Sequence, residues 1–562
     1  MIDLRIENAL VFDGTGAAGV ACNVAIDGGK IIVDTGQAAV TTIDASGLSL
    51  MPGIIDSHTH FDAQITWDNS LKPSPSLGVT TAVIGNCGFT IAPCKAEHRD
   101  LTMRNLTQVE GMSLEVLRSA IDWSFESFPQ YLQQLKTKGC IINTAAYIGH
   151  SSVRTYVMGQ DAAHRAATRD EIDAMAQLVR EAMQVGAIGF ATSTSPAHNG
   201  EGGLPMPSRL ACDAEMLALT KAMGEPVAGV KKGVYMVTKG GHMSIDFLEK
   251  LSAESERPVM IAALLHNNTN PTGVFNDLAA IAAANHRGNK LIGQVSCCPL
   301  SMDFTLQSPY PVEGLQSWQP ALGKSGEALK AVLRDAHFRN AVRAELAAPA
   351  VFRLFNGEWD QLHLTEAASE KYRNCEQQPF GKLAQSMNRD PLDLMLDIAI
   401  EENLQSVFTA MLLNSNEEAV GQMLNHDYSI VSLSDAGAHL TFFNDAGFGL
   451  HLLGHWSRDK NVMPLQEAVR QLTSLPASIF GFDKGEHKRG LIKEGYAADL
   501  LLFDPKTVGR GPKKRVFDLP GGAARLTTDA VGVHGVWVNG HRIVDESGMF
   551  AEDALPGKLL LS

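Results

Sequence analysis

The segment "MPGIIDSHTHFDAQITWD", residues 51–68, is the most informative part of this sequence. Two isoleucines lead into Asp56, and His58 and His60 follow at a spacing of two residues. Alternate residues of a β-strand point to the same face, so we expect both imidazoles to project in one direction. Converging neutral imidazoles are good ligands for zinc and similar transition metals. The segment therefore predicts one part of a metal site, for which the rest of the chain must supply further ligands.

Length and composition limit the class of protein. The chain has 562 residues, of which 45% are hydrophobic and 19% charged, as in a packed globular protein of one large or several smaller domains. A net charge of −15 argues against binding of nucleic acid or of an anionic membrane. We find no secretory signal pattern and no apolar run of about eighteen residues. The eight cysteines form no CxxC pair, which favours reduced thiols and a cytoplasmic location. Symmetric self-association is expected for a cytoplasmic protein of this size.

Apolar segments that end in polar residues alternate with amphipathic helical segments over residues 53–485. Continuous apolar runs are typical of strands that are buried on both faces. With the strand before His58, the candidate strands number eight, and they predict a (β/α)₈ TIM barrel within the α/β class, with the site at the strand ends. Thr168 and Glu171 have the spacing of a capping box at one helix start. The other candidate strands are residues 80–88, 142–150, 187–195, 233–241, 258–268, 291–299 and 428–439.

The two ends of the chain share a sequence pattern that differs from that of the middle. Residues 1–52 and 486–562 contain short alternating strands with Gly and Asp-Gly turns, which is typical of hairpins. We expect these two segments to build one small β-sandwich domain together. Residues 299–385, roughly, are rich in proline, aromatic and charged residues and are predicted to form a lid over the barrel mouth.

Three further residues at predicted strand ends are candidate metal ligands. Cys87, in "VIGNCGFT", is either a buried small side chain, a metal-bound thiolate or a nucleophile, and metal ligation is slightly favoured. Asp435, in "VSLSDAGAH", is either a helix cap or a catalytic carboxylate that binds metal and moves a proton. His266, in "IAALLHNN", is equally well read as a ligand or as an ordinary hydrogen-bonded histidine.

Two histidines are candidates for substrate contact. His150, in "YIGHSSVR", ends the predicted third strand and is as well explained by ordinary hydrogen bonding. His439 follows Asp435 by four residues and is expected either behind the metal ligands or facing the substrate.

The motifs "PGIIDSHTHFD", "GVTTAVIGNCGFTIAP", "SLSDAGAH", "IKEGYAADLLLFD" and "VWVNGHRIVDE" together resemble the amidohydrolase superfamily. The GNCG segment narrows the resemblance to its D-aminoacylase, or N-acyl-D-amino-acid deacylase, branch. The resemblance covers nearly the whole chain. It implies a zinc site in which His58, His60 and Cys87 bind one or two ions. It also implies that Asp435 is the catalytic aspartate for hydrolysis of an amide by metal-activated water.

The sequence departs from the pattern of that branch at three places. The segment 233–241 ends without the histidine that the branch carries there, since His242 comes later. Asn268 stands where the branch has a substrate-binding lysine, so we expect it to face the substrate. The arginine expected shortly after Asp435 is absent. The departures predict a mononuclear or altered metal centre and a lost anchor for a substrate carboxylate.

The resulting prediction is a metal-dependent hydrolase of a non-peptide C–N bond in a small molecule. Trp318 and Trp359 in the expected lid suggest a bulky or aromatic N-acyl substrate. Three alternatives stay open: a hydrolase of cyclic amides, ureas or carbamates, nucleophilic catalysis by Cys87, and a catalytically inactive relative that acts as a binding protein.

Overall fold

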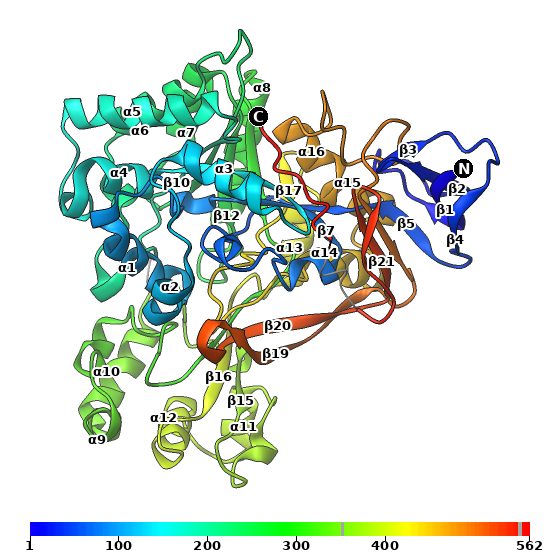
Figure 1. The fold of residues 1–562 in the computed structure, drawn as a ribbon. Coiled ribbons are helices and arrows are strands. Elements are labelled where there is room, and N and C mark those ends of the chain that lie inside the picture. The colour runs from blue at the N-terminus through cyan, green and yellow to red at the C-terminus, as the bar shows by residue number, and fades with distance from the viewer. Residues whose placement is uncertain (350–352, 549–553) are drawn as a thin grey trace. The chain divides into compact units, whose positions relative to one another are not determined.

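The chain is an α/β protein in the computed structural model, which describes residues 1–349, 353–548 and 554–562 (Figure 1). It divides into two compact units. Unit 1 comprises Met1–Leu264, Asp277–Cys297 and Gly421–Ser562, whereas unit 2 comprises Leu265–Asn276 and Cys298–Val420. Each unit is described by itself below.

Parallel strands form the centre of unit 1. One sheet has the order β6-β7-β8 and another has the order β17-β13-β12-β11-β10-β9, and all neighbours in both sheets run parallel. All eight predicted strand segments contain strands. The strands are β6 (Ile54–Asp56), β7 (Val79–Ile84), β8 (Asn143–Ala146), β9 (Ile148–Gly149), β10 (Gly189–Ser193), β11 (Val234–Thr238), β12 (Val259–Leu264), β13 (Leu291–Val295) and β17 (Ser429–Val431).

The ends of the first and last of these strands lie side by side. Thr59, just after β6, forms a parallel bridge with Ala436, and the His60 N–H donates to the carbonyl of Ala436 at 2.7 Å. This bridge brings together residues from the beginning and the end of the parallel series. It also places the two motifs that contain His58 and Asp435 next to each other.

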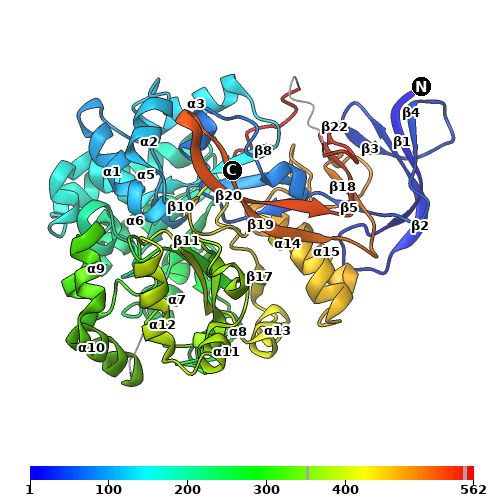
Figure 2. The same cartoon turned by 90° about the horizontal axis from the view of Figure 1, so that it is seen from below.

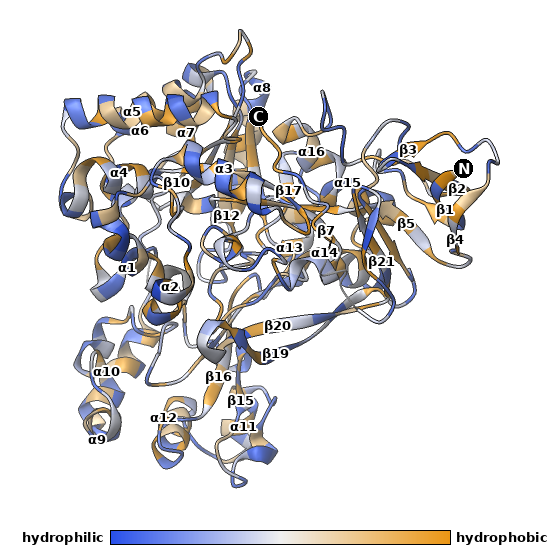
Figure 3. Cartoon of the chain, viewed as in Figure 1, coloured by the Kyte–Doolittle hydropathy of each residue, from blue (hydrophilic) through white to orange (hydrophobic). Residues whose placement is uncertain are grey.

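Helices connect the parallel strands. Helix α5 begins at the predicted capping box, in which the backbone N–H of Thr168 donates to Glu171 Oε2 at 2.7 Å. Its apolar and polar faces are visible in Figure 3. The helices with at least half of their residues in unit 1 are α1 (Arg99–Glu110), α2 (Leu114–Ala120), α3 (Phe128–Lys138), α4 (His150–Met158), α5 (Arg169–Gln184), α6 (Asp213–Met223), α7 (Ile245–Ser255), α8 (Gly273–His286), α13 (Glu417–Leu424), α14 (Phe448–His451), α15 (Leu465–Leu472) and α16 (Ser474–Phe480).

Both ends of the chain contribute strands to one eight-stranded sheet with the order β22-β21-β18-β5-β1-β2-β3, in which β4 also pairs with β1. The junction is antiparallel, with Leu50 opposite Leu502, and both side chains belong to a buried apolar cluster that includes Trp537. Pairing of distant segments thus stabilises the sheet by burial of apolar surface. The strands are β1 (Ile2–Val11), β2 (Val20–Asp27), β3 (Lys30–Ile32), β4 (Ala39–Asp44), β5 (Ser49–Pro52), β18 (Leu500–Phe503), β21 (Val533–Val538) and β22 (His541–Val544).

A long antiparallel hairpin, β19 (Gly509–Leu519) and β20 (Ala523–Val531), forms a separate two-stranded ribbon in unit 1 (Figure 2). It is bonded to the loop that follows Asp435. The Leu526 N–H donates to the Leu440 carbonyl at 2.7 Å, and Arg510 pairs with Asp445 at 2.7 Å. The C-terminal segment therefore supports a loop that belongs to the candidate site.

Unit 2 contains a three-stranded antiparallel sheet with the order β14-β16-β15 and four helices. It includes the insertion expected at about residues 299–385 and extends beyond it. The side chain of Trp318 is 1% exposed and packs edge-on against Phe338, so it belongs to the core of unit 2, and a contact between this tryptophan and the substrate stays a prediction. The elements are β14 (Leu300–Phe304), α9 (Gly326–Arg334), α10 (Ala336–Ala347), β15 (Leu362–Glu366), α11 (Phe380–Ser386), α12 (Pro391–Glu401) and β16 (Val407–Leu413).

None of the helices in the described part of the chain has the length and apolar character that crossing a membrane would need.

Candidate metal centre and active site

Three predicted ligands converge in unit 1. His58 and His60 follow β6, and Cys87 follows β7. The Sγ atom of Cys87 lies 3.5 Å from Nε2 of His58 and 3.9 Å from Nε2 of His60. One donor atom from each residue lies within 4.8 Å of the others, and all three side chains are buried. Two imidazoles and a thiolate are a ligand set that suits zinc.

Asp435, after β17, adds a carboxylate to the same point. Its Oδ1 lies 3.2 Å from Nε2 of His58 and 3.6 Å from Nε2 of His60. Asp435 has a positive φ of 48°, a conformation that non-glycine residues seldom adopt and that is typical of functional sites. The backbone therefore aims this carboxylate at the two histidines, as predicted.

The turn that carries Cys87 is held by close backbone packing. Cys87 has a φ of 58°, and the neighbouring Gly88 has a φ of 76°. A Cβ atom on Gly88 would meet the carbonyl oxygen of Ala191 at 2.5 Å, so the turn can form only with glycine at this position. Steric packing thus explains the glycine that follows Cys87 in the GNCG motif. This glycine allows the tight turn that directs the Cys87 side chain toward the strand ends.

A buried amide orients the first histidine. Nδ1 of His58 donates to Oε1 of Gln294 on β13 at 3.1 Å, which leaves Nε2 as the ring atom that can bind a metal. Gln294 is in turn bonded to Ser432, and Ser432 is bonded to Ser57. The ring orientation of His58 is therefore fixed by Gln294 on β13 together with the serines that directly follow β17 and β6.

The charges in the cluster stabilise one another. Burial alone would raise the pKa of Cys87, but His58 and His60 lower it to about 7. Burial would also raise the pKa of Asp435, yet the same two histidines hold it below its ordinary value. Burial lowers the pKa of His58, whereas Cys87 and Asp435 raise it above its ordinary value. The arrangement favours a thiolate and a carboxylate, the ionised forms that metal ligation requires.

A model of the Amidohydrolase family matches residues 41–293 and 359–544, which together make up most of the chain. The chain belongs to the amidohydrolase family. This confirms the resemblance drawn from the HxH, GNCG and SDAGAH motifs.

Two curated relatives of this amidohydrolase come from Alcaligenes xylosoxydans xylosoxydans. A D-aminoacylase is 27% identical over 98% of this chain and 96% of its own length. An N-acyl-D-aspartate deacylase is 26% identical over 99% of this chain and 95% of its own.

Two solved structures share the fold, each covering 100% of both chains. The crystal structure of a D-aminoacylase matches with a TM-score of 0.66 at 24% identity. The N-acyl-D-glutamate deacylase of Bordetella bronchiseptica, solved with zinc and a phosphonate inhibitor, matches with a TM-score of 0.66 at 22% identity. A further D-aminoacylase structure is described with a binuclear metal centre.

A pocket of about 60 Å³ surrounds the cluster of this amidohydrolase. It contains the predicted residue His439, and it also contains His198, which the sequence analysis missed. The lining residues are His58, His60, Cys87, Phe89, His198, Thr238, Ala263, Leu433, Asp435 and His439. The only sequence signal for His198 is its place shortly after the polar end of β10.

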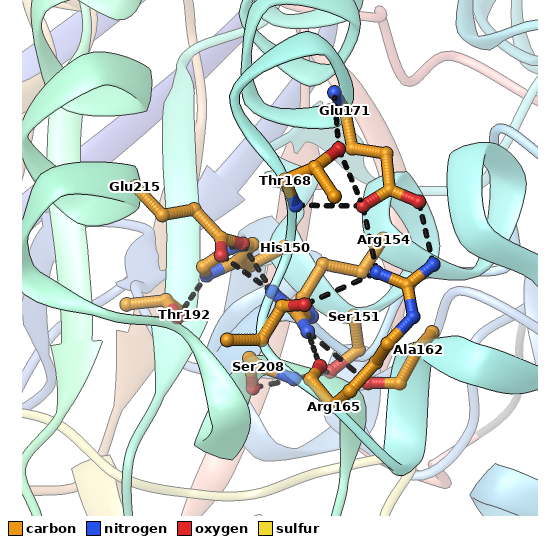
Figure 4. Close-up of polar contacts among 11 residues, drawn as sticks. His150, Ser151, Arg154, Ala162, Arg165, Thr168, Glu171, Thr192, Ser208 and Glu215 are labelled. Atoms are coloured by element: carbon orange, nitrogen blue, oxygen red, sulfur yellow. Dashed lines mark hydrogen bonds and ion pairs between the residues drawn. The ribbon is translucent and has the colours of Figure 1, made fainter.

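His150 belongs to a fully buried network instead (Figure 4). Its Nε2 lies 2.9 Å from Glu215, and its Nδ1 lies 2.7 Å from the hydroxyl of Thr192. Glu215 also accepts from Arg154 at 2.5 Å. Both ring nitrogens are thus engaged, so the geometry does not support our prediction that His150 contacts the substrate.

The remaining predicted site residues, His266 and Asn268, lie in unit 2. The backbone N–H of His266 donates to Oδ1 of Asn414 at 2.7 Å. The side chain of Asn268 donates to Glu358 at 2.7 Å and to Ser415 at 3.0 Å. Their roles as metal ligand and substrate contact stay predictions.

Proposed function

We propose that this chain is a zinc-dependent hydrolase of amide bonds other than peptide bonds, similar to the N-acyl-D-amino-acid deacylases. The observation that carries the proposal is the convergence of His58, His60 and Cys87 with Asp435. The curated relatives, by name a D-aminoacylase and an N-acyl-D-aspartate deacylase, support an acylated amine as the substrate.

The donor set fits a zinc ion. Two imidazole nitrogens and one thiolate sulfur lie within 4.8 Å of one another, and Asp435 adds an oxygen beside both imidazoles. When bound, zinc would supply Lewis-acid activation of water and of the amide carbonyl. We assign His58, His60 and Cys87 as ligands, and Asp435 as ligand and catalytic carboxylate.

The proposed chemistry needs a group that takes a proton from water and gives it to the departing nitrogen. Asp435 is placed for this role, because its pKa is held low and it is therefore ionised before turnover. Gln294 fixes the orientation of His58, and Oδ1 of Asp435 lies 3.2 Å from its Nε2, so both atoms can face one ion.

We infer a single ion in this chain. Around the cluster the pocket is lined by Thr238 at the end of β11 and by Ala263 near the end of β12. Neither side chain is a usual zinc ligand. Within the described residues, the group of three converging His, Cys, Asp or Glu donors is His58, His60 and Cys87, with Asp435 beside the two histidines.

We propose that the parallel strands close into a (β/α)₈ barrel, with the sheet built from both chain ends as a small β-sandwich domain beside it in the chain. The bridge between Thr59 and Ala436 supports closure. We also propose a cytoplasmic location, which the eight free cysteines support. We further propose that the insertion at about residues 299–385 acts as a lid, that the substrate carries a bulky N-acyl group, and that the chain self-associates.

Elemental analysis of the purified protein followed by a substrate panel tests the function. We expect about one zinc per chain and hydrolysis of N-acyl amines in the panel. Cyclic amides, ureas or carbamates as the preferred substrates would favour the second candidate hydrolase. Activity that resists chelators but is lost on thiol modification would favour Cys87 as a nucleophile. A protein with neither metal nor activity would support the inactive binding protein.

A further inference from the structure

His198 lies in the active-site wall without belonging to the ligand cluster. It follows β10 in the loop after Ser193. Its ring packs edge-on against Phe89, with ring centroids 5.0 Å apart, and Phe89 in turn lies 6.3 Å from the ring of His60. His198 and Phe89 both line the pocket that contains His58 and His60. A residue at this position can contact a substrate that is bound at the cluster.

The hydrogen-bond partners of Ser193 favour one tautomer of His198. Oγ of Ser193 lies 2.6 Å from Nδ1 of His198 and already accepts from the backbone N–H of Ser195 at 3.2 Å. Within the described residues, the acceptor in reach of the Ser193 hydroxyl hydrogen is Nδ1 of His198. Nδ1 is therefore the acceptor and Nε2 carries the hydrogen, because a neutral imidazole has one of each. Nε2–H is then the ring donor available to the pocket that His198 lines.

This donor carries no charge. Burial lowers the pKa of His198 to about 3, and His439 acts in the same direction, so the ring is neutral at pH 7. An uncharged N–H suits a carbonyl oxygen, which is an acceptor that needs no counter-ion.

The described walls of the pocket offer no lysine or arginine side chain to a substrate carboxylate, and Asp435 adds a negative charge. Lys239, directly after the lining residue Thr238, pairs with Asp277 at 3.1 Å. A buried carboxylate without a cationic partner is costly.

We propose that His198 binds the substrate by donating a hydrogen bond from Nε2 to an uncharged carbonyl oxygen, and that the site takes neutral N-acyl amines in preference to N-acyl amino acids. This inference rests on the proposed function and deepens it by naming a substrate-binding residue and a substrate class. It departs from the carboxylate-bearing substrates that the names of the relatives indicate.

Three variants of the zinc-loaded, full-length chain test the contact. His198→Phe keeps an aromatic ring against Phe89 but removes the donor, and we expect kcat/KM for a neutral amide to fall about tenfold or more. His198→Gln places an amide N–H near the position of Nε2 and should recover most of that loss. His164→Phe, at an exposed histidine outside the pocket, should match the wild type. Zinc content should be equal in all four proteins.

A matched pair of substrates tests the class. N-acetyl-2-phenylethylamine and N-acetyl-D-phenylalanine differ by one carboxylate, and we expect the wild type to prefer the neutral compound by about tenfold or more in kcat/KM. Preference for the carboxylate would overturn the substrate class. Wild-type turnover by His198→Phe would overturn the contact.

Calorimetric binding of the neutral amide to wild type and His198→Phe separates this inference from the proposed function. Weaker binding to the variant supports the contact even if neither protein turns the amide over. Equal binding by the two proteins, or none by the wild type, overturns it. An inactive, metal-free wild type would overturn the proposed function instead.

Discussion

Oδ1 of Asp435 lies 3.2 Å from Nε2 of His58, although the two residues come from strands near opposite ends of the parallel series. The contact exists because the bridge between Thr59 and Ala436 aligns the segments that follow β6 and β17. The contact places the proposed proton-transfer group beside the proposed ligand cluster. Because different residues carry the two roles, mutations can test them separately.

Asp435→Asn should reduce kcat by about 10²–10⁴-fold, the usual contribution of a general acid–base group. An amide at this position cannot accept the proton from water. His58, His60 and Cys87 remain in the variant, so zinc measured by elemental analysis should stay above half of the wild-type content. Near-wild-type turnover by Asp435→Asn would remove the proton-transfer role from this residue.

His58→Ala should lose both zinc and activity, because it deletes the imidazole that contacts both Cys87 and Asp435. A matched control is His451→Ala, which removes another largely buried histidine of unit 1 that does not line the pocket. Zinc per chain and turnover should be measured on both proteins. Full zinc content in His58→Ala would contradict the assigned ligand set.

Gly88→Ala should weaken zinc binding even though Gly88 offers no ligand atom. The added Cβ would meet the Ala191 carbonyl at 2.5 Å, and the φ of 76° is unfavourable for alanine. We expect the turn that carries Cys87 to move, with a loss of zinc affinity of about tenfold or more. Competition with a fluorescent chelator measures this, and Gly229→Ala, whose Cβ would meet no atom within 4 Å, controls for a strained glycine elsewhere. Unchanged affinity in Gly88→Ala would show that the turn tolerates a side chain.

Periodicity and motif spacing were sufficient to predict the parallel strands and the cluster. Apolar runs that end in polar residues predict all eight strand segments, because strands that are buried on both faces consist almost entirely of apolar residues. His58, His60, Cys87 and Asp435 stood directly at strand ends, where a parallel sheet brings side chains together. The spatial proximity of these residues could therefore be predicted although they lie far apart in the sequence.

Side-chain partners could not be predicted in the same way. His150 also follows a strand, but its partner Glu215 lies on α6, and no local sequence pattern predicts that pairing. His198 lies several residues beyond β10, in a loop whose path the sequence leaves open. Trp318 looked like a pocket wall by composition, whereas packing against Phe338 buries it in unit 2. Each outcome depends on a tertiary contact rather than on local sequence.

The buried network around His150 should make unit 1 sensitive to acid. Burial alone would raise the pKa of Glu215, but His150 and Arg154 hold it below its ordinary value of 4.5. Its ionised form therefore stabilises the fold above that pH, and this contribution is lost as the pH falls through the lowered pKa. Burial lowers the pKa of His150 below 6.5, so stability is also lost on acidification once the unfolded chain takes up that proton.

Glu215→Gln should lower the free energy of unfolding by about 3 kcal/mol at pH 7, because it leaves the buried Arg154 without a charged partner. The free energy of unfolding should also fall more steeply between pH 6.5 and pH 4 than in the wild type, because Glu215 no longer raises the pKa of His150 and the folded chain takes up that proton only at lower pH. Urea midpoints followed by circular dichroism at several pH values measure both effects. Glu225→Gln, which breaks an exposed pair with Arg180, should cost less than about 1 kcal/mol. Equal midpoints for the two variants would mean that the His150 network contributes no more than a surface ion pair.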